Sequence, residues 1–73
     1  MRRVAVVSTS ISTVGYAEPS RILEVEFCNG GVYQYLNVPP DEHAALMVSA
    51  SKGLHVNREI KTRFSFLRVD GGQ

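Results

Sequence analysis

The chain has 73 residues, a formal net charge of +1 at pH 7, and 44% hydrophobic against 21% charged residues. A chain of this length supports one hydrophobic core, because two halves would each have too little apolar surface to bury. The composition excludes a disordered polyelectrolyte, and the near-neutral charge argues against a dedicated, sequence-independent nucleic-acid binder. We predict one domain over residues 1–73, with residues 1–9 as an N-terminal arm or edge strand, 10–69 as the core and 70–73 as a loose tail.

The sequence lacks the usual signals of secretion, membrane insertion and metal binding. Cys28 is the only cysteine, so no internal disulfide can form. Cysteines and histidines do not cluster at zinc-binding intervals, and the apolar run Val4, Ala5, Val6, Val7 is too short for a signal peptide or a membrane span. We expect a cytoplasmic protein that uses no metal or other cofactor and does not contact a membrane.

Hydrophobic alternation predicts three antiparallel strands in the first half. Residues 22–27 alternate apolar side chains with glutamates, the pattern of a strand with one solvated face. Asn29-Gly30 then separates this segment from the β-rich residues 32–36, which is a strong hairpin signal. Residues 11–16 read as a further strand, joined through a turn that contains Pro19.

A helix is predicted over residues 40–50, where proline suits the first turn and two acidic residues lie near the positive end of the helix dipole. The stripe that should cover the sheet consists of His43, Leu46, Met47 and Ala50. Gly53 is expected as a left-handed cap, and a short helix with Val56 and Ile60 inward should follow over residues 54–60. The predicted fold is α+β: a three- or four-stranded antiparallel meander, with one main helix and a second short helix packed on one face.

Tyr33 and Tyr35 share one face of their strand, and the length of the hairpin loop decides which face that is. A two-residue loop, Asn29-Gly30, puts them on the glutamate face as a platform on which bases could stack. A three-residue loop that also includes Cys28 shifts the pairing by one residue and turns both tyrosines into the core.

The last third of the chain is basic, with a single acid, Glu59. Its candidate phosphate contacts are Lys52, Arg58, Lys61 and Arg63, although a solvated charged face is the simpler explanation of this pattern. His43, His55 and Cys28 each lack a partner at the spacing that catalysis or metal binding needs. We therefore expect no enzymatic activity and no small-molecule substrate.

The N-terminal arm is the predicted protein-binding segment, and its residues are Arg3, Val4, Ala5, Val6, Val7 and Ser8. Its β-branched residues favour an extended strand. Such a strand either adds to the sheet of a partner, with main-chain hydrogen bonds, or forms an edge of the domain's own sheet.

An ordered series of short motifs spans most of the chain. It comprises Val14-Gly15-Tyr16, Leu23-Glu24-Val25-Glu26-Phe27, Asn29-Gly30, Val32-Tyr33-Gln34-Tyr35, Val38-Pro39, Ser51-Lys52-Gly53, Asn57-Arg58 and Ile60. Over residues 10 to 69 this series resembles the KTSC domain. The resemblance implies a short bacterial or phage domain with a central Tyr-x-Tyr, found alone or at the C-terminus of some lysyl-tRNA synthetases. RNA binding has been suggested for the family, and it supplies no catalytic residues to carry over.

As a free-standing chain, the sequence is also similar to small phage transcription regulators that bind the RNA polymerase of their host. Our leading hypothesis is a regulator that binds bacterial RNA polymerase in the host cytoplasm and inhibits transcription. The arm would form the apolar centre of the contact, with basic residues at its rim. The alternative is a small RNA-binding domain that uses Tyr33, Tyr35 and the basic segment.

Overall fold

The computed structural model describes residues 3–69, which form an antiparallel sheet with helices on one face. Its five strands follow the order of the chain: β1 (Arg3–Ala5), β2 (Ile11–Ala17), β3 (Ile22–Phe27), β4 (Val32–Tyr35) and β5 (Phe66–Arg68). The predicted α+β meander is confirmed, and its sheet is wider than expected because segments from both ends of the chain join its edges. Met1 and Arg2 of the predicted arm, and the tail predicted over residues 70–73, lie outside the described residues.

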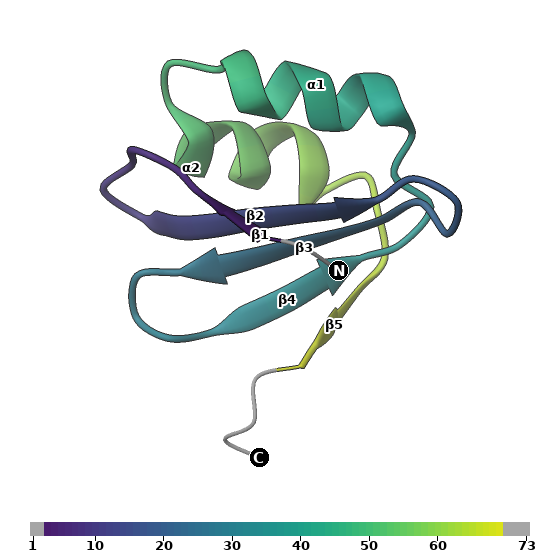
Figure 1. Ribbon diagram of the computed structural model, residues 1–73, viewed down its shortest axis with the longest axis horizontal. Helices are drawn as coiled ribbons and strands as arrows, with labels where there is room; N and C mark the ends of the chain where they lie inside the picture. Colours follow the sequence, from purple (N-terminus) through teal and green to yellow (C-terminus); the bar gives the residue numbers. More distant parts are fainter. Residues whose placement is uncertain (1–2, 70–73) are drawn as a thin grey trace.

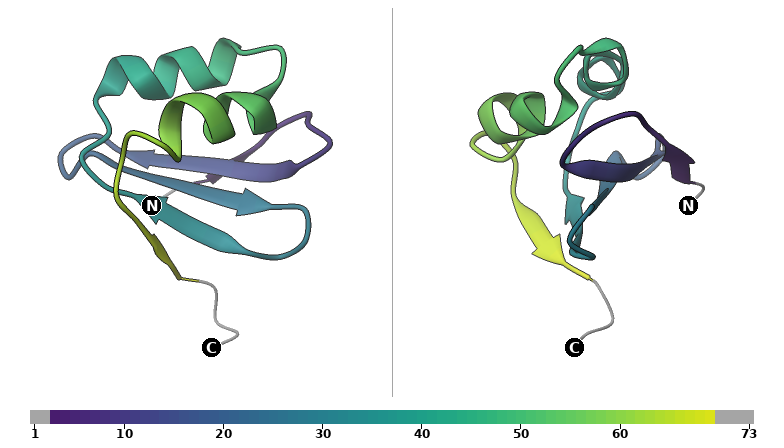
Figure 2. Two further views of the ribbon diagram at one scale, coloured as in Figure 1. Left: turned by 180° about the vertical axis from the view of Figure 1, so that it is seen from behind. Right: turned by 90° about the vertical axis from the view of Figure 1, so that its left-hand side faces the viewer.

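The helical layer connects β4 to β5 and covers one face of the sheet (Figure 1). It consists of α1 (Pro40–Val48) and α2 (Lys52–His55), and α2 continues directly into a π-helical turn, η1 (Val56–Ile60). Seen end-on, β1 and β5 form opposite edges of the sheet (Figure 2). Helix α1 ends two residues before the predicted boundary, so the prediction that Ala50 belongs to the buried stripe is wrong: Ala50 is exposed and lies beyond the helix.

The core lies between the helices and the sheet face beneath them. Nine apolar side chains are at most 3% exposed: Ile11, Val14, Leu23, Val25, Tyr35, Val38, Leu46, Val56 and Ile60. Two of them, Val56 and Ile60, are the pair predicted to point inward from the second helix. Strands β2 and β3 supply four of the nine, so much of the stability depends on the burial of their inward-facing residues.

The hairpin between β3 and β4 has the longer of the two predicted loops. Leu23 pairs with Tyr35 and Val25 with Tyr33, while the Phe27 N–H donates to the Gly31 carbonyl at 2.8 Å. Three residues, 28–30, remain in the loop, and Gly30 adopts a φ of +97°, a left-handed conformation that glycine takes at little cost. Both tyrosines therefore point to the helix-covered face, and the stacking platform predicted on the glutamate face is wrong.

Gly53 has a different role from the predicted helix cap. It lies inside α2, where it packs against the loop that precedes β2. A β-carbon at this position would lie 2.6 Å from Ser10 Oγ and 3.0 Å from Ser10 Cβ, which is closer than van der Waals contact allows. Glycine is required here because the two backbones approach closely.

Candidate nucleic-acid interface

A pocket of about 270 Å³ opens on the helix-bearing face of the sheet, next to the turn between β3 and β4. Its aromatic lining comes from Phe27, Tyr33, Tyr35 and Phe66, and its polar lining from Asn29, Asn57, Lys61 and Arg68. Strands β3, β4 and β5 supply most of these residues, whereas Asn57 and Lys61 come from η1 and the turn after it. The pocket therefore forms where the helical layer ends and stops covering the sheet.

Tyr33 is the centre of the aromatic part. Its ring meets the Phe27 ring edge-on, with centroids 5.6 Å apart, and it meets the Phe66 ring at 5.7 Å and a tilt of 60°. The Arg68 guanidinium carbon lies 5.7 Å from the centroid of Tyr33, within the range of a cation–π contact. Tyr33 is half-buried and Phe66 is 44% exposed, so aromatic surface remains accessible from solvent.

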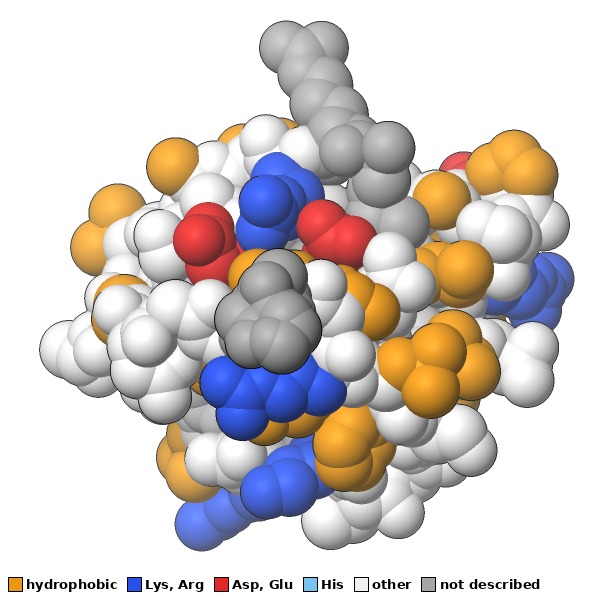
Figure 3. All heavy atoms as spheres, turned by 90° about the horizontal axis from the view of Figure 1, so that it is seen from below, with side chains coloured by type: hydrophobic (Ala, Val, Ile, Leu, Met, Phe, Trp, Pro, Cys, Tyr) orange, Lys and Arg blue, Asp and Glu red, His pale blue; other side chains and the backbone are white. Residues whose placement is uncertain are grey.

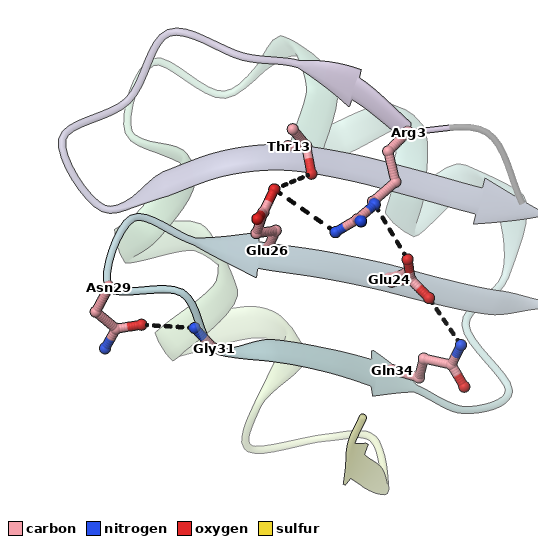
Figure 4. A network of polar contacts seen from close by, with 7 residues as sticks. All are labelled: Arg3, Thr13, Glu24, Glu26, Asn29, Gly31 and Gln34. Carbon is pink, nitrogen blue, oxygen red and sulfur yellow. Dashed lines mark hydrogen bonds and ion pairs between the residues drawn. The ribbon is translucent and has the colours of Figure 1, made fainter. Parts of the chain in front are cut away.

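Gly31 also lines the pocket and has no side chain that would occupy it. A β-carbon built there would lie 3.3 Å from Asn29 Oδ1, 3.4 Å from Tyr33 Cε1 and 3.7 Å from Arg68 Nη2. The neighbouring Asn29 side chain is fixed by its own turn, because its Oδ1 accepts a hydrogen bond from the Gly31 N–H at 3.0 Å (Figure 4). Within residues 3–69, no aspartate or glutamate lines the pocket, so its charged groups are both basic.

The four predicted phosphate contacts do not converge on one surface. Lys61 lies at the pocket with Tyr33 and Tyr35, while Arg58 lines a separate shallow hollow. The Arg63 guanidinium forms ion pairs with Glu42 at 3.1 Å and Glu59 at 3.5 Å. The Lys52 ammonium donates to the Ser49 carbonyl at 3.0 Å. Of the predicted basic set, Lys61 is therefore the member that the fold brings to the aromatic residues.

The arm forms an edge strand of the domain's own sheet, which is one of its two predicted arrangements. Residues 3–5 pair with β2, and the Arg3 guanidinium crosses over Gly15 to reach two glutamates of β3. Its Nε lies 3.2 Å from Glu24 Oε2, and its Nη1 lies 3.6 Å from Glu26 Oε1. Thr13 and Gln34 hydrogen-bond the same glutamates (Figure 4). The glutamate face is thus a closed polar network.

Other residues of the predicted binding arm differ in accessibility. Val4 is 52% exposed and Val7 is 98% exposed, whereas Val6 packs against the core. Ser8 is used within the chain, since its Oγ accepts hydrogen bonds from the N–H groups of Ser10 and Ile11, each at 3.2 Å. Arg3 and Ser8 therefore make internal contacts, and Val4, Ala5 and Val7 carry the exposed surface of the arm.

Seen from below, the uncovered face of the sheet shows acidic and basic side chains side by side among hydrophobic ones (Figure 3). The Arg3 network with Glu24 and Glu26 belongs to this face. Opposite charges this close largely cancel at a distance, so the Arg3 network gives little field of a single sign to attract phosphates. The pocket on the other face is the better candidate site for an anionic partner.

The residues considered for catalysis are not among those that line the pocket. The His43 ring stacks on Tyr16 with centroids 4.6 Å apart, and burial lowers the pKa of His43. Cys28 is exposed at the hairpin turn, and His55 has a buried Nε2 for which residues 3–69 supply no hydrogen-bond partner. In the described part of the chain, no three potential metal-binding side chains among His, Cys, Asp and Glu gather at one place. The same residues include no helix long and apolar enough to span a bilayer.

Sequence reasoning missed most of the residues that surround Tyr33: Phe27, Asn29, Gly31, Asn57, Phe66 and Arg68. The three-residue hairpin loop already implied that Phe27 and Tyr33 share a face of the sheet, so that alternative predicts that the two side chains lie near each other. The pairing of Tyr33 with Arg68 across β4 and β5 left no local signal, because 35 residues separate the two positions.

Comparisons with known proteins agree with this architecture. The family model described as the KTSC domain matches residues 7–64. A crystal structure of a KTSC domain protein from Yersinia pestis superposes with a TM-score of 0.89 at 37% identity, covering 93% of this chain and 96% of that one. This fold and these matches show that the chain belongs to the KTSC domain family.

Two relatives show the contexts in which similar sequences occur. An uncharacterized protein of Stutzerimonas stutzeri is 41% identical over 71 residues, covering 96% of this chain and all of the relative. A lysine–tRNA ligase of Nostoc punctiforme is 39% identical over 56 residues, which cover 77% of this chain but 10% of the ligase. Similar domains therefore occur both as small proteins and as a minor part of a much larger enzyme.

Proposed function

We propose that this chain is a binding domain for single-stranded RNA and that the Tyr33 pocket is its contact site. The observation that carries the proposal is an aromatic pocket flanked by Lys61 and Arg68, with no acidic lining within residues 3–69. Proteins bind unpaired bases by stacking them on aromatic rings, while basic side chains follow the phosphates. The exposed part of Phe66 and the half-buried Tyr33 supply the aromatic surface.

The arrangement supports binding of a short unpaired segment rather than a duplex. A volume of about 270 Å³ accepts a small planar group, and of the predicted phosphate contacts Lys61 alone lines it. The match to part of a lysine–tRNA ligase adds support, because that enzyme acts on an RNA, although the domain covers 10% of it. We propose that the domain works in the cytoplasm by binding alone, without catalytic residues or a cofactor.

Fluorescence anisotropy with short single-stranded RNA tests this proposal. Affinity should fall steeply between low and physiological salt, because phosphate contacts release counterions. Lys61→Gln should weaken binding and make the slope of log affinity against log salt shallower by about one unit. Lys52→Gln is the matched control, since Lys52 does not line the pocket and the change in charge is the same. The proposal is wrong if no RNA binds in low salt or if both variants lose affinity equally.

Binding to bacterial RNA polymerase is a second proposal, and it is supported by a different surface. Among the strands of residues 3–69, β1 pairs with β2 alone, so its outer edge offers main-chain groups to a partner strand. Val4 on this strand is 52% exposed and supplies an apolar side chain at the edge. A phage-type regulator that inhibits transcription would use this edge for protein–protein contacts.

Co-elution of this protein with purified bacterial RNA polymerase on a sizing column tests the second proposal. Val4→Asp should abolish co-elution and relieve any inhibition of transcription in vitro, because a charge would replace the apolar contact. Val48→Asp is the matched control, since Val48 is 84% exposed on α1, away from this edge. Separate elution at micromolar concentration, together with unchanged transcription, would exclude polymerase binding.

A further inference from the structure

We propose that the Tyr33 pocket binds one nucleotide with a preference for guanine over adenine. This inference rests on the proposed RNA binding and adds to it a base specificity. It starts from two hydrogen-bonding side chains of the pocket lining, Lys61 and Asn29. The Lys61 ammonium group can only donate.

The orientation of Asn29 adds a further donor. A backbone N–H can only donate, so the Asn29 atom that lies 3.0 Å from the Gly31 nitrogen must be the amide oxygen. The amide nitrogen is therefore on the other arm of this side chain, which is exposed at the turn and lines the pocket. The turn thus fixes which half of the Asn29 amide remains available to a ligand.

Guanine and adenine differ in the groups that such donors would meet. The major-groove edge of guanine presents two acceptors, N7 and O6, whereas adenine presents the N7 acceptor beside the N6 amino donor. Donors from Asn29 and Lys61 can pair with both guanine acceptors, whereas adenine would place its amino group against one of these donors at the position of guanine O6. The two purines have nearly equal stacking surfaces, so Tyr33 and Phe66 should not distinguish them.

Titration with guanosine and adenosine 5′-monophosphates, followed by NMR, tests the inference on the full chain. Guanosine monophosphate should bind about fivefold or more tightly, as expected for one net hydrogen bond. Its binding should shift the resonances of Asn29, Gly31 and Tyr33. The same ratio should hold for two uridine-rich RNA oligonucleotides that differ in one central guanosine or adenosine.

Asn29→Asp is the diagnostic variant, because the carboxylate still accepts from the Gly31 N–H but replaces the NH₂ donor with an acceptor. It should reduce the guanine-to-adenine ratio to about one or below. Asn37→Asp is the control, since Asn37 is exposed, does not line the pocket and makes the same change in charge. Circular dichroism checks that both variants fold.

The outcomes separate this inference from the proposed function. Equal affinity for the two oligonucleotides, with salt-dependent binding intact, would overturn the guanine preference and leave RNA binding standing. A guanine preference that Asn29→Asp leaves unchanged would also overturn it, because the selecting donor would then lie elsewhere. If no RNA or nucleotide binds the wild-type protein, both the inference and the proposed function fail.

Discussion

Replacing Gly53 with alanine should destabilise the domain, although alanine is the better helix former. Gly53 lies within α2, so alanine alone would favour the helix by about 0.5–1 kcal/mol. The new methyl group, however, would lie 2.6 Å from Ser10 Oγ and 3.0 Å from Ser10 Cβ. Rotation of the serine moves Oγ away but leaves Cβ in place, so the backbones themselves must separate.

That separation is resisted, because the Ser10 carbonyl accepts a hydrogen bond from the Cys28 N–H at 2.8 Å. Overpacking of this kind typically costs about 1–3 kcal/mol, which exceeds the gain in helix propensity. We expect Gly53→Ala to lose about 1–2 kcal/mol of unfolding free energy. For a domain of this size, each kilocalorie lowers the melting temperature by about 4–8 °C.

Thermal and urea unfolding of four proteins measure the effect: the wild type, Gly53→Ala, Ser10→Gly and the double variant. Ser10→Gly removes both clashing atoms, so the double variant should recover stability and the two sites should couple by about 1 kcal/mol or more. A Gly53→Ala protein that melts at or above the wild-type temperature would show that the close approach does not constrain α2.

Three further predictions concern the pocket, the β1 edge and acid stability. Gly31→Ala should change the unfolding free energy by less than about 1 kcal/mol, because the nearest atoms to its methyl group belong to the Asn29 and Tyr33 side chains. It should nevertheless weaken RNA binding severalfold, because the methyl group takes up space at the pocket; urea unfolding and anisotropy measure the two effects. Arg3→Gln removes two partly exposed ion pairs, so it should speed amide hydrogen exchange in β1 several-fold and lower the global unfolding free energy by no more than about 1 kcal/mol. Uniform slowing of exchange, or no change in exchange across the sheet, would contradict this prediction. Burial lowers the pKa of His43 below about 6.5, so the unfolded chain binds more protons than the folded chain on acidification. The contribution of the neutral, buried His43 to stability is complete above that pH and is lost as the pH falls through the lowered pKa. The stability advantage of the wild type over His43→Gln should therefore shrink on acidification, and a constant difference between the two proteins would refute this prediction.

Local patterns predicted the strands and helices because each depends on neighbouring residues. The alternation around Glu24 and Glu26 defined β3 with its observed bounds, and the spacing of Val56 and Ile60 placed both in the core. The end of α1 was predicted too late, since no signal in Ala50 or Ser51 marks the residue at which the backbone leaves the helix. Gly53 was predicted to cap the preceding helix, and its actual role was missed because its contact with Ser10 joins segments far apart in the chain.

The candidate site was harder to predict than the fold, because it depends on a loop register and on a non-local strand pairing. Asn29-Gly30 fits either hairpin loop, and only the longer loop turns Tyr33 toward Phe27. Phe66 and Arg68 reach Tyr33 only after the chain has passed through the whole helical layer. The periodicity of one segment does not reveal a pairing between distant strands. The predicted basic set was therefore chosen by nearness in the sequence, and it left out Arg68, which lines the pocket with Lys61.

The two proposed binding surfaces belong to opposite edges of one sheet, and this separation makes them independently testable. Val4 lies on β1, whereas the pocket that contains Lys61 is built around β4 and β5. Mutations at distant sites with no shared partners usually act additively. Val4→Asp should therefore leave RNA affinity unchanged, and Lys61→Gln should leave polymerase co-elution unchanged. If each variant impaired both activities, a single surface or a shared change in fold would have to explain them, and the assignment of separate edges would be wrong.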